Sequence, residues 1–460
     1  MSLRSCARAA APRLAPVLLL LTLGGCSDSG GPTRRDARLR SDGGADSAGP
    51  PPGATLSFVS RLVLDVERAG THSVVAAHGA ELGVAYFRDV LPADEPTVSC
   101  PPSAIGSGPV DRKRPAQDLM YVRFDGAAWG TPVKVDQTIG PTHGLSLIFN
   151  RSGQPQLGYL GGAPSQRGCD SSDAVAAGST DGGATWSKRT IAAAGSTGDT
   201  VGHWTSLALD CDGVVHATYR DVHFGYYEQD GNARAEWRFD GGEDIGGRDG
   251  NGQGFGDGMY TSLIFTPAPD CRAVALATNL VAKGALGGLR LAVRGSSGWT
   301  RKQLVPGGTD EYPRLASDGR GRYAIAYFAP ADKSLRYIES SDLEQWSQPE
   351  LVDLSTSQHG LYSSLAFDAA GNPAVSYYRC ARAGAEKCEP AEDAVMLAYR
   401  LDGKWRTWVV DDGGEQLCGR YTSLAFAPGN EPVVAYECVS LRNQGNEFLS
   451  GAKVARGVWK

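Results

Sequence analysis

The sequence predicts an all-β fold, a seven-bladed β-propeller built from four-stranded antiparallel blades. The first observation is a phrase that returns about once every 50 to 70 residues: an apolar run, a turn rich in Gly, Asn, Asp and Pro, and a second apolar run that usually ends in an aromatic residue. Such a phrase is the pattern of a β-hairpin. Repeated hairpins of this period are typical of a propeller. Its seven copies begin at His72, Gly144, Trp204, Tyr260, Tyr312, Tyr362 and Tyr421.

The second observation is that most hairpins are followed by a third strand, a turn, a tryptophan and a fourth strand that ends near an aspartate. Clear examples are LMYVRFDGAAWGTPVKVD, LRYIESSDLEQWSQPELVD and VMLAYRLDGKWRTWVVDD, which run to Asp136, Asp353 and Asp411. Each repeat therefore supplies the four strands of one blade.

The third observation concerns how the ring closes. The last repeat stops at Lys460 without a fourth strand, whereas a spare strand, Phe58–Asp65, precedes the first hairpin. The spacing from Asp65 to His72 equals that from Asp136 to His143. We therefore predict that Phe58–Asp65 completes the seventh blade, which removes the open edges of a linear stack of sheets.

The N-terminal segment, residues 1–25, has the features of an export signal. Three arginines precede the apolar run Val17–Leu23, which is too short for a membrane span. Leu23-Gly24-Gly25-Cys26 resembles a bacterial lipobox, and this resemblance implies lipidation of Cys26; the alternative is an ordinary secretory signal with a chance cysteine. Ser27 follows, which favours the outer membrane in the Gram-negative sorting pattern that this segment resembles. The predicted location is the bacterial cell envelope, with the lipid anchor as the one contact with the membrane.

Residues 26–54 are rich in Gly, Ser, Pro, Asp and Arg, so we expect a disordered tether, followed by the propeller over residues 55–460. The formal net charge of −6 gives no reason to expect nucleic acid as a partner. We expect the propeller to be a monomer.

The cysteines favour disulfides, because an exported chain keeps an even set of eight once Cys6 leaves with the signal and Cys26 takes lipid. The repeat register favours two pairs between neighbouring blades, Cys211–Cys271 and Cys100–Cys169. The connectivity of Cys380, Cys388, Cys418 and Cys438 stays open. A metal–thiolate site is disfavoured, since the spacings lack paired CxxC motifs.

A further motif, STDGGATW at Ser179–Trp186, has the form of an Asp-box, and SSDLEQW at Ser340–Trp346 is a shortened copy. On this point the chain resembles the sialidase-like (BNR-repeat) propeller superfamily. In that family the box is structural, and the residue chemistry agrees: Asp and Ser bond the backbone of a tight turn, and Trp supplies buried area. The structural assignments are Ser179, Asp181, Gly183 and Trp186.

The resemblance also raises the question of activity. Sialidases carry an early Arg-Ile/Leu-Pro motif, three arginines, a Tyr/Glu nucleophile pair and an aspartate acid/base, but Arg61-Leu62-Val63 lacks the proline here. Seven blades also differ from the six usual in that family, and a fold alone does not carry chemistry. The catalytic candidates are Asp89, Asp221, Tyr436 and Glu437.

Candidate ligand-binding residues gather where the first strand of each blade starts and the second ends, because these points share one face. Insertions at residues 90–117, 161–173 and 381–393 follow the same end. Aromatic, imidazole and charged groups suit a carbohydrate or an extended peptide, although the repeat could have copied them for structural reasons. The candidates are His72, His143, His203, His359, Trp204, Tyr260, Tyr312, Tyr362, Tyr421, Arg88, Arg220, Arg379 and Arg420, with Glu311 at a matching position.

The sequence offers two candidate metal sites. A transition metal on the histidines is disfavoured, because no HxH or HxxxH pair occurs. The insertion DGNGQGFGD follows the first nine places of a calcium loop, although its twelfth place falls on Tyr260 instead of a bidentate Glu. Calcium is therefore a possible cofactor, with a solvated Gly-rich loop as the alternative. Its ligands would be Asp249, Asn251, Gln253 and Asp257.

Together these observations predict a surface-anchored lipoprotein whose propeller binds a carbohydrate or protein ligand on its insertion-bearing face. One alternative is a sialidase-like glycoside hydrolase, or a glycan lyase, acting on extracellular glycans. The other is a structural module of the envelope, which predicts a shallow, featureless face. An enzyme requires a carboxylate pair near an arginine in a pocket.

Overall fold

The structure is a computed structural model that falls into two units, Met1–Gly44 and Ala45–Lys460. Everything below concerns the second unit. The predicted export signal, the lipidated Cys26 and most of the tether lie outside the described residues. Those residues are 49–50, 53–66, 68–100, 110–113, 115–139, 143–161, 172–194, 199–223, 234–247, 257–279, 288–306, 311–353, 358–380, 393–414, 416–440 and 450–460.

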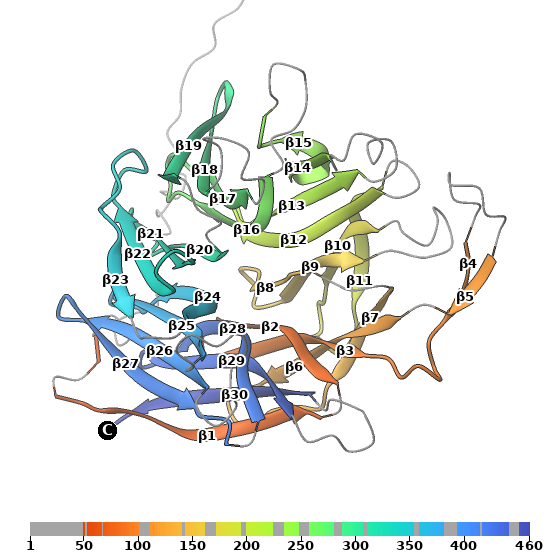
Figure 1. The fold of residues 1–460 in the computed structure, drawn as a ribbon, viewed down its shortest axis with the longest axis horizontal. Coiled ribbons are helices and arrows are strands. Elements are labelled where there is room, and N and C mark those ends of the chain that lie inside the picture. The colour runs from red at the N-terminus through yellow and green to blue at the C-terminus, as the bar shows by residue number, and fades with distance from the viewer. Residues whose placement is uncertain are drawn as a thin grey trace, which may run out of the picture. The chain divides into compact units, whose positions relative to one another are not determined.

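The unit is an all-β propeller of seven four-stranded antiparallel blades, as predicted (Figure 1). Blade 1 contains β2 (Ala69–His78), β3 (Glu81–Asp89), β6 (Ala116–Phe124) and β7 (Val133–Ile139). Blade 2 contains β8 (Leu145–Phe149), β9 (Pro155–Gly161), β10 (Asp173–Gly178) and β11 (Ser187–Ala192). Blade 3 contains β12 (Asp199–Leu209), β13 (Val215–His223), β14 (Arg234–Phe239) and β15 (Glu243–Asp244).

Blade 4 contains β16 (Asp257–Phe265), β17 (Ala273–Asn279), β18 (Gly288–Gly295) and β19 (Gly298–Pro306). Blade 5 contains β20 (Glu311–Ser317), β21 (Tyr323–Ala329), β22 (Ser334–Ser340) and β23 (Glu350–Asp353). Blade 6 contains β24 (Gln358–Phe367), β25 (Pro373–Cys380), β26 (Ala394–Leu401) and β27 (Lys404–Asp411). A separate hairpin, β4 (Thr97–Cys100) with β5 (Val110–Lys113), lies within the insertion after β3.

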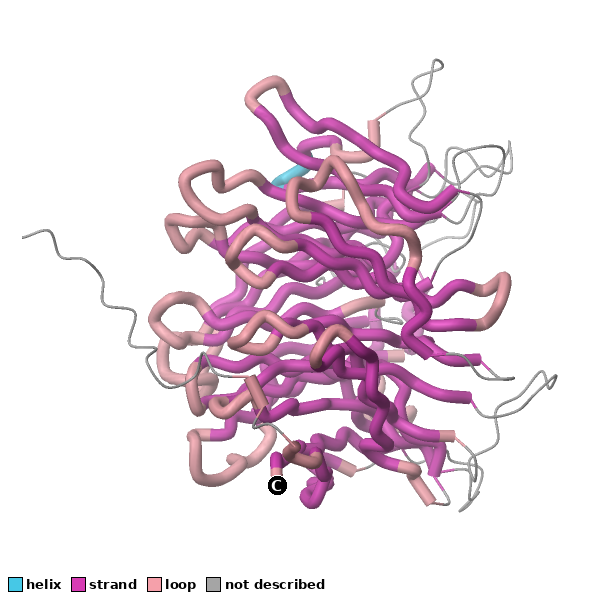
Figure 2. Tube along the Cα trace, turned by 90° about the vertical axis from the view of Figure 1, so that its left-hand side faces the viewer, coloured by secondary structure: helices cyan, strands magenta, loops and turns pink. Residues whose placement is uncertain are grey.

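Blade 7 is closed by both ends of the propeller chain. Its order is β28 (Gln416–Ala427), β29 (Glu431–Ser440), β30 (Ser450–Trp459) and then β1 (Leu56–Asp65), so the predicted closure by the N-terminal strand is confirmed. Thr55 and Lys460 exchange two backbone hydrogen bonds of 2.9 Å at the end of this ladder. The ring therefore has no free edge at the junction. Figure 2 shows the strands of the blades from the side, with most of the short turns at one end.

The innermost strands are joined from blade to blade by a belt of serines. In five blades a serine stands two residues after the first residue of the hairpin phrase, and its hydroxyl accepts a hydrogen bond of 3.0–3.2 Å from a backbone N–H in the next blade. These N–H groups would otherwise lack a strand partner beside the channel. The serines are Ser146, Ser206, Ser262, Ser364 and Ser423.

Tyrosine–aspartate bonds join the blades farther out. A buried tyrosine of a second strand donates to an aspartate of the outermost strand of the preceding blade, as for Tyr159 on Asp136 at 2.7 Å and Tyr436 on Asp411 at 2.7 Å. Tyr86 bonds Asp65 in the same way at 2.9 Å. In these blades the aromatic and the aspartate that mark the repeat thus form one inter-blade contact.

The Asp-box has the geometry of a self-bonded turn. The hydroxyl of Ser179 lies 2.8 Å from Asp181 and accepts from the N–H of Gly183 at 2.7 Å, and the indole of Trp186 donates to the Gly183 carbonyl at 3.0 Å. The shortened copy repeats this arrangement, with Trp346 donating to Leu343 at 3.1 Å. Both boxes stabilise the turn between the third and fourth strands of a blade.

Disulfides also reinforce the rim and the last blade. Cys211 and Cys271 are bonded between blades 3 and 4, which confirms the pairing predicted from repeat register. Cys418 is bonded to Cys438 across β28 and β29, and Cys380 is also disulfide-bonded. The predicted Cys100–Cys169 pair lies outside the side chains that the structure describes. Within the described part of the chain, no helix has the length and apolar character needed to cross a bilayer.

Candidate functional site

Aromatic side chains close a complete ring around the central channel. Neighbouring ring centroids are 4.3 to 6.5 Å apart all the way round, and each of the seven members comes from a different blade. All seven are among the predicted ligand-binding residues; six share one position of the repeat, and His143 fills the gap left by Gly144. The members are His72, His143, Trp204, Tyr260, Tyr312, Tyr362 and Tyr421.

The backbone of this ring is left-handed. The six aromatic residues at the repeat position have φ between 51° and 56°, and Gly144 at the same position has 85°. A bulky residue in this region costs about 1–3 kcal/mol, so the conformation persists where surrounding contacts enforce it. The contacts cross between blades. The hydroxyl of Ser363 donates to the carbonyl of Tyr312 at 2.7 Å, and the hydroxyl of Thr422 donates to the carbonyl of Tyr362 at 2.7 Å. The left-handed backbone orients each aromatic side chain into the channel.

A glycine two residues before the aromatic makes room for this bend in most blades. At Gly202, φ is 108° and an added Cβ would lie 2.8 Å from the backbone of Ala174. At Gly419, φ is 119° and an added Cβ would lie 2.8 Å from the ring of Tyr378. The third strand or an aromatic side chain of the preceding blade therefore passes too close for any side chain at this point.

The ring nearly fills the channel. The space left between the aromatic side chains is a cavity of about 50 Å³. This is room for a few water molecules or one small ion, and too little for a sugar. The central channel alone is therefore not a carbohydrate site.

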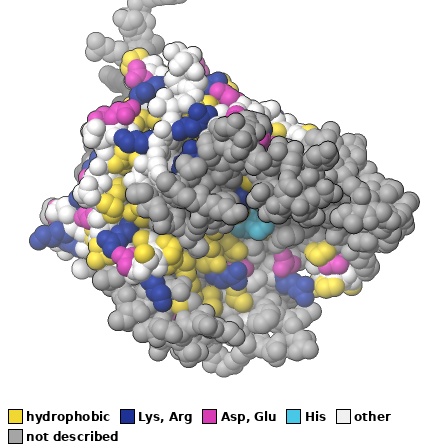
Figure 3. Space-filling view, turned by 45° about the horizontal axis from the view of Figure 1, so that its top comes forward, with side chains coloured by type: hydrophobic (Ala, Val, Ile, Leu, Met, Phe, Trp, Pro, Cys, Tyr) yellow, Lys and Arg dark blue, Asp and Glu magenta, His cyan; other side chains and the backbone are white. Residues whose placement is uncertain are grey.

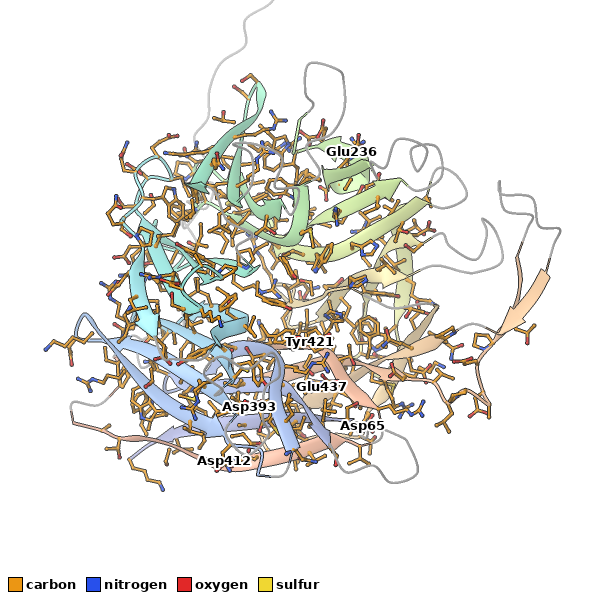
Figure 4. All side chains as sticks on the ribbon, viewed as in Figure 1. Asp65, Glu236, Asp393, Asp412, Tyr421 and Glu437 are labelled. Atoms are coloured by element: carbon orange, nitrogen blue, oxygen red, sulfur yellow. A yellow bond between two sulfur atoms is a disulfide. The ribbon has the colours of Figure 1, made fainter. Side chains whose placement is uncertain are left out.

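A larger cavity of about 480 Å³ lies beside the ring, where blade 7 meets blade 1. It sits at the end from which the insertion 90–117 leaves blade 1, and thus on the predicted insertion-bearing face. Figure 4 places Glu437 and Tyr421 near one another toward the centre of the propeller and Asp412 at the rim. The cavity is lined by Thr71, Asp89, Leu417, Arg420, Glu437, Val439 and Ser450.

Glu437 is the most buried charged group of this cavity, with 3% of its surface exposed. One carboxylate oxygen accepts a hydrogen bond of 3.2 Å from the hydroxyl of Thr71. The other lies 3.5 Å from Nε of Arg420, an ion pair without hydrogen-bond geometry, so this oxygen has no hydrogen-bond donor. A buried acceptor of this kind is ready to take a donor from a ligand.

Burial raises the pKa of Glu437, and the charge of Asp89 adds to the rise, whereas Arg420 and Thr71 oppose it. Burial acts to lower the pKa of Arg420, but the negative charge of Glu437 together with the neighbouring Tyr362 and Tyr421 raises it overall. The guanidinium also stacks over Tyr421 at 5.4 Å. Arg420 therefore joins the cavity to the aromatic ring.

Asp89 faces the same cavity from the end of β3 and is exposed. The amide of Gln117 donates to it at 2.6 Å. The neighbouring arginine, Arg88, is instead paired with Asp65 and Asp118 at 3.5 and 3.4 Å. The structure thus brings Asp89, Glu437 and Arg420 together, and it places Arg88 elsewhere.

Blade 3 carries a second group of predicted residues. The imidazoles of His143 and His203 are stacked with centroids 4.8 Å apart, and Arg220 lies over the ring of Trp204 at 5.5 Å. Burial, followed by the charges of His143 and Arg220, lowers the pKa of His203 to about 3. Asp221 lies 4.0 Å from Arg238. Figure 3 shows a patch of histidine surface near the centre of the view, beside charged and hydrophobic side chains.

Tyr436 and Glu437 are not brought together as a nucleophile pair. Successive residues of a strand point to opposite sides, so Tyr436 is fully buried between blades while Glu437 faces the cavity. The hydroxyl of Tyr436 donates to Asp411, and burial raises the pKa of Tyr436. Its role in the structure is the inter-blade bond described above.

The remaining predicted residues fall partly outside the described side chains. These are His359, Glu311 and the calcium-loop candidates Asp249, Asn251, Gln253 and Asp257. Arg379 is described, lying at the end of β25 away from the 480 Å³ cavity. In the described part of the chain, one group of three potential metal ligands occurs, Asp411 with Cys418 and Cys438, but the two cysteines are bonded to each other.

Thr71 is a site residue that the sequence interpretation missed. It occupies in blade 1 the place that Arg420 occupies in blade 7, directly before the left-handed aromatic. The signal was present, since five copies of the repeat read Gly-X-aromatic with X lying beside the ring. Comparing X across copies would have placed Thr71, His203 and Arg420 in one layer.

Comparison with known proteins finds solved structures of similar fold. No family model matches the chain, and no curated protein is similar to it in sequence. Similar solved structures include a protein of unknown function from Dyadobacter fermentans, with a TM-score of 0.45 and 12% identity over 87% of this chain and 98% of that one. A Hadza microbial sialidase has a TM-score of 0.45 and 12% identity, covering 87% of this chain and 96% of that chain.

Trypanosoma rangeli sialidase in complex with the inhibitor DANA has a TM-score of 0.46 and 13% identity. The match covers 71% of this chain and 56% of the sialidase, so this chain spans little more than half of that protein. The chain is a seven-bladed propeller structurally similar to sialidases and to a propeller of unknown function. These likenesses concern the fold.

Proposed function

We propose that the protein is a lipid-anchored envelope protein that binds a carbohydrate in the cavity between blades 7 and 1. The observation that carries this proposal is a buried carboxylate oxygen of Glu437, without a hydrogen-bond donor, in a cavity of about 480 Å³. Pockets of roughly 300–1,000 Å³ are the usual size for small ligands. A featureless face, as a purely structural module predicts, does not agree with such a cavity.

The lining suits a polyhydroxylated ligand. Sugar hydroxyls donate to carboxylates and accept from guanidinium and hydroxyl groups, all of which are present in Asp89, Arg420 and Ser450. Leu417 and Val439 supply apolar surface for the faces of a sugar ring. Two carboxylates against one guanidinium favour neutral or amine-bearing sugars over acidic ones. Anchoring through Cys26 would hold this cavity outside the membrane.

The first experiment is a glycan array with the full-length protein, read with calcium and with a chelator. Wild type should bind a defined set of neutral or amino sugars, and Glu437→Gln should weaken binding at least tenfold. Asp412→Asn is the matched control, because Asp412 is an exposed carboxylate whose only ion-pair contact among the described residues is with Arg61 at 3.9 Å. Equal loss in both variants, or none in Glu437→Gln, would contradict the proposal. Complete silence on the array would favour a protein ligand.

Glycoside hydrolysis is a second candidate, favoured by one observation. Glu437, with its raised pKa, and Asp89 face one cavity, and the negative charge of Asp89 raises the pKa of Glu437. A protonated carboxyl beside an ionised one is the pairing that glycosidases use: the acid protonates the leaving oxygen, and the other group activates water or attacks the sugar. Mass spectrometry of the array supernatant separates the candidates, because hydrolysis releases sugar that Asp89→Asn and Glu437→Gln both abolish.

A further inference from the structure

The serine belt around the channel is broken in two blades, and the breaks differ in kind. Blade 1 has Val74 at the serine position, which loses a hydroxyl and remains neutral. Blade 5 has Arg314, two residues after Tyr312, where blade 6 has Ser364 two residues after Tyr362. A guanidinium only donates hydrogen bonds, so Arg314 cannot replace the serine acceptor. Blade 5 therefore gives up an inter-blade bond and gains a charge.

Among the described residues, Arg314 has no counter-charge in the channel. It lines the 50 Å³ cavity together with members of the aromatic ring and is half-buried. In the part of the chain that the structure describes, no side chain forms an ion pair or hydrogen bond with Arg314. Burial lowers the pKa of Arg314, and no neighbouring charge offsets this. By contrast, Arg88 and Arg420 each have a carboxylate beside them, and Arg220 lies over an aromatic ring.

An isolated cation among aromatic rings is costly, because desolvation removes its water and nothing replaces that stabilisation. The same cavity is lined by four tyrosines, whose hydroxyls can donate to a negatively charged guest. Burial raises the pKa of Tyr421 to about 12, so its phenol keeps its proton at neutral pH. The cation, the phenol donors and the limited space together determine the charge and size of a ligand that this cavity can bind.

We infer that the central channel is a binding site for one small monovalent anion, held by Arg314 and the surrounding tyrosines. The cavity of about 50 Å³ fits a halide or a formate-sized carboxylate and is too small for a sugar. One guanidinium neutralises one charge, which disfavours divalent anions. This site is separate from the 480 Å³ cavity, and the inference does not depend on the proposed carbohydrate function.

The test compares wild type with Arg314→Ser, which restores the serine found at this position in five blades and should fold for that reason. Thermal unfolding is followed at constant ionic strength while bromide, chloride or formate replaces a bulky organic anion. For wild type we expect a saturable rise in Tm of about 2 °C. Arg314→Ser should show no saturable rise, and Ser262→Ala, a belt variant without a charge change, should keep it. Halide and formate arms distinguish an inorganic anion from a carboxylate.

A bromide-soaked crystal provides the second measurement. We expect an anomalous peak beside the guanidinium in wild type and none in Arg314→Ser. The inference is overturned if wild type and Arg314→Ser respond equally to all the anions, or if bromide occupies no position near residue 314. If Arg314→Ser does not fold, the wild-type bromide peak alone decides.

Discussion

Blades 3 and 7 carry the same repeat and present opposite charges beside the channel. In both blades the residue directly before the left-handed aromatic lies opposite the residue directly after the buried tyrosine of the neighbouring strand. These pairs are His203 with Arg220 in blade 3 and Arg420 with Glu437 in blade 7. In blade 7 the pair is a cation and a buried carboxylate, with Asp89 opposite. In blade 3 both members are basic, and the imidazole of His143 is stacked on that of His203.

The comparison shows that the fold determines where side chains meet, whereas the residue at each place determines the charge. In both blades burial opposes the charged form of one group: the pKa of Glu437 is raised and that of His203 is lowered. The buried charge in blade 7 is balanced by its partner. In blade 3 the basic partners repel each other, so the neutral form of His203 is favoured more strongly. The two blades should therefore respond differently to substitution and to pH.

The largest effect is expected from Arg420→Leu, which gives blade 7 the leucine of blade 6 and leaves Glu437 without its cation. We expect a loss of about 3 kcal/mol in the free energy of unfolding at neutral pH, at the low end for a broken buried pair because Arg420 is partly exposed. Without Arg420 the pKa of Glu437 rises further, so the loss should shrink as pH falls and the carboxyl is protonated. Urea titrations at neutral and mildly acidic pH measure this.

The double variant Arg420→Leu with Glu437→Tyr copies the Leu361 and Tyr378 pair of blade 6. It should regain most of the lost stability. A double variant as unstable as the single one would show that the deficit comes from packing and not from the unpaired carboxylate.

The next effect is expected from His203→Leu in blade 3. The pKa of His203 lies at about 3 in the folded protein against 6.5 for an ordinary histidine, so its contribution to stability is present above pH 6.5 and is lost as pH falls toward 3. The variant should lose about 4 kcal/mol less than wild type over that range, because each unit of pKa is worth about 1.4 kcal/mol, and chemical denaturation at several pH values measures this.

His216 provides a control of opposite sign. Its hydrogen bond to Asp240 raises the pKa of His216, despite partial burial. Its contribution is therefore present at low pH and lost as pH rises through the raised pKa. If His203→Leu and His216→Leu change the pH profile in the same direction, the assignment for His203 is wrong.

A smaller effect is expected from Tyr436→Phe. This change removes the donor to Asp411 and should cost about 1–1.5 kcal/mol, because the buried carboxylate loses one hydrogen bond but keeps Lys453 at 3.7 Å. Carbohydrate binding should be unchanged, since Tyr436 points away from the cavity. Loss of binding or of sugar release at unchanged stability would assign Tyr436 a direct role and contradict its placement.

The smallest effect on stability is expected from Asp89→Asn, because Asp89 is exposed. The free energy of unfolding should change by less than about 0.5 kcal/mol. The negative charge of Asp89 raises the pKa of Glu437, so its removal should lower that pKa. Carbon-detected NMR of labelled glutamate side chains measures the shift, and an unchanged titration of Glu437 would show that the two carboxylates do not interact.

Much of the fold could be predicted because the repeat encodes it locally. Hairpins have a period-two apolar pattern, and the spacing from Asp65 to His72 was sufficient to assign the closing strand. The Cys211–Cys271 pair followed from the same register. Cys418 and Cys438 belong to one hairpin, and their pairing depends on which residues of β28 and β29 lie opposite each other. That detail is set by the two register shifts of β28 on either side of Arg420, which sequence periodicity does not show.

The candidate site could be predicted only in outline. Asp89, Arg420 and Glu437 were placed on one face, but their convergence depends on blade 1 packing against blade 7 across the closure. Tyr436 was paired with its sequence neighbour, although strand alternation separates them. The left-handed backbone of the ring depends on contacts between blades, so no local propensity encodes it. Arg314 stands inside the repeat phrase as YPRL among WTSL, YTSL and YSSL, a departure that sequence comparison alone could have detected.

The two hydrogen bonds between Thr55 and Lys460 have a consequence for protein engineering. Because both ends of the propeller chain meet there, a short peptide linker could join them and the chain could be reopened elsewhere, such as at the turn after Asp402 in blade 6. Such a circular permutant would move the point of closure out of blade 7. The strands that carry Thr71 and Glu437 would then belong to one uninterrupted stretch of polypeptide.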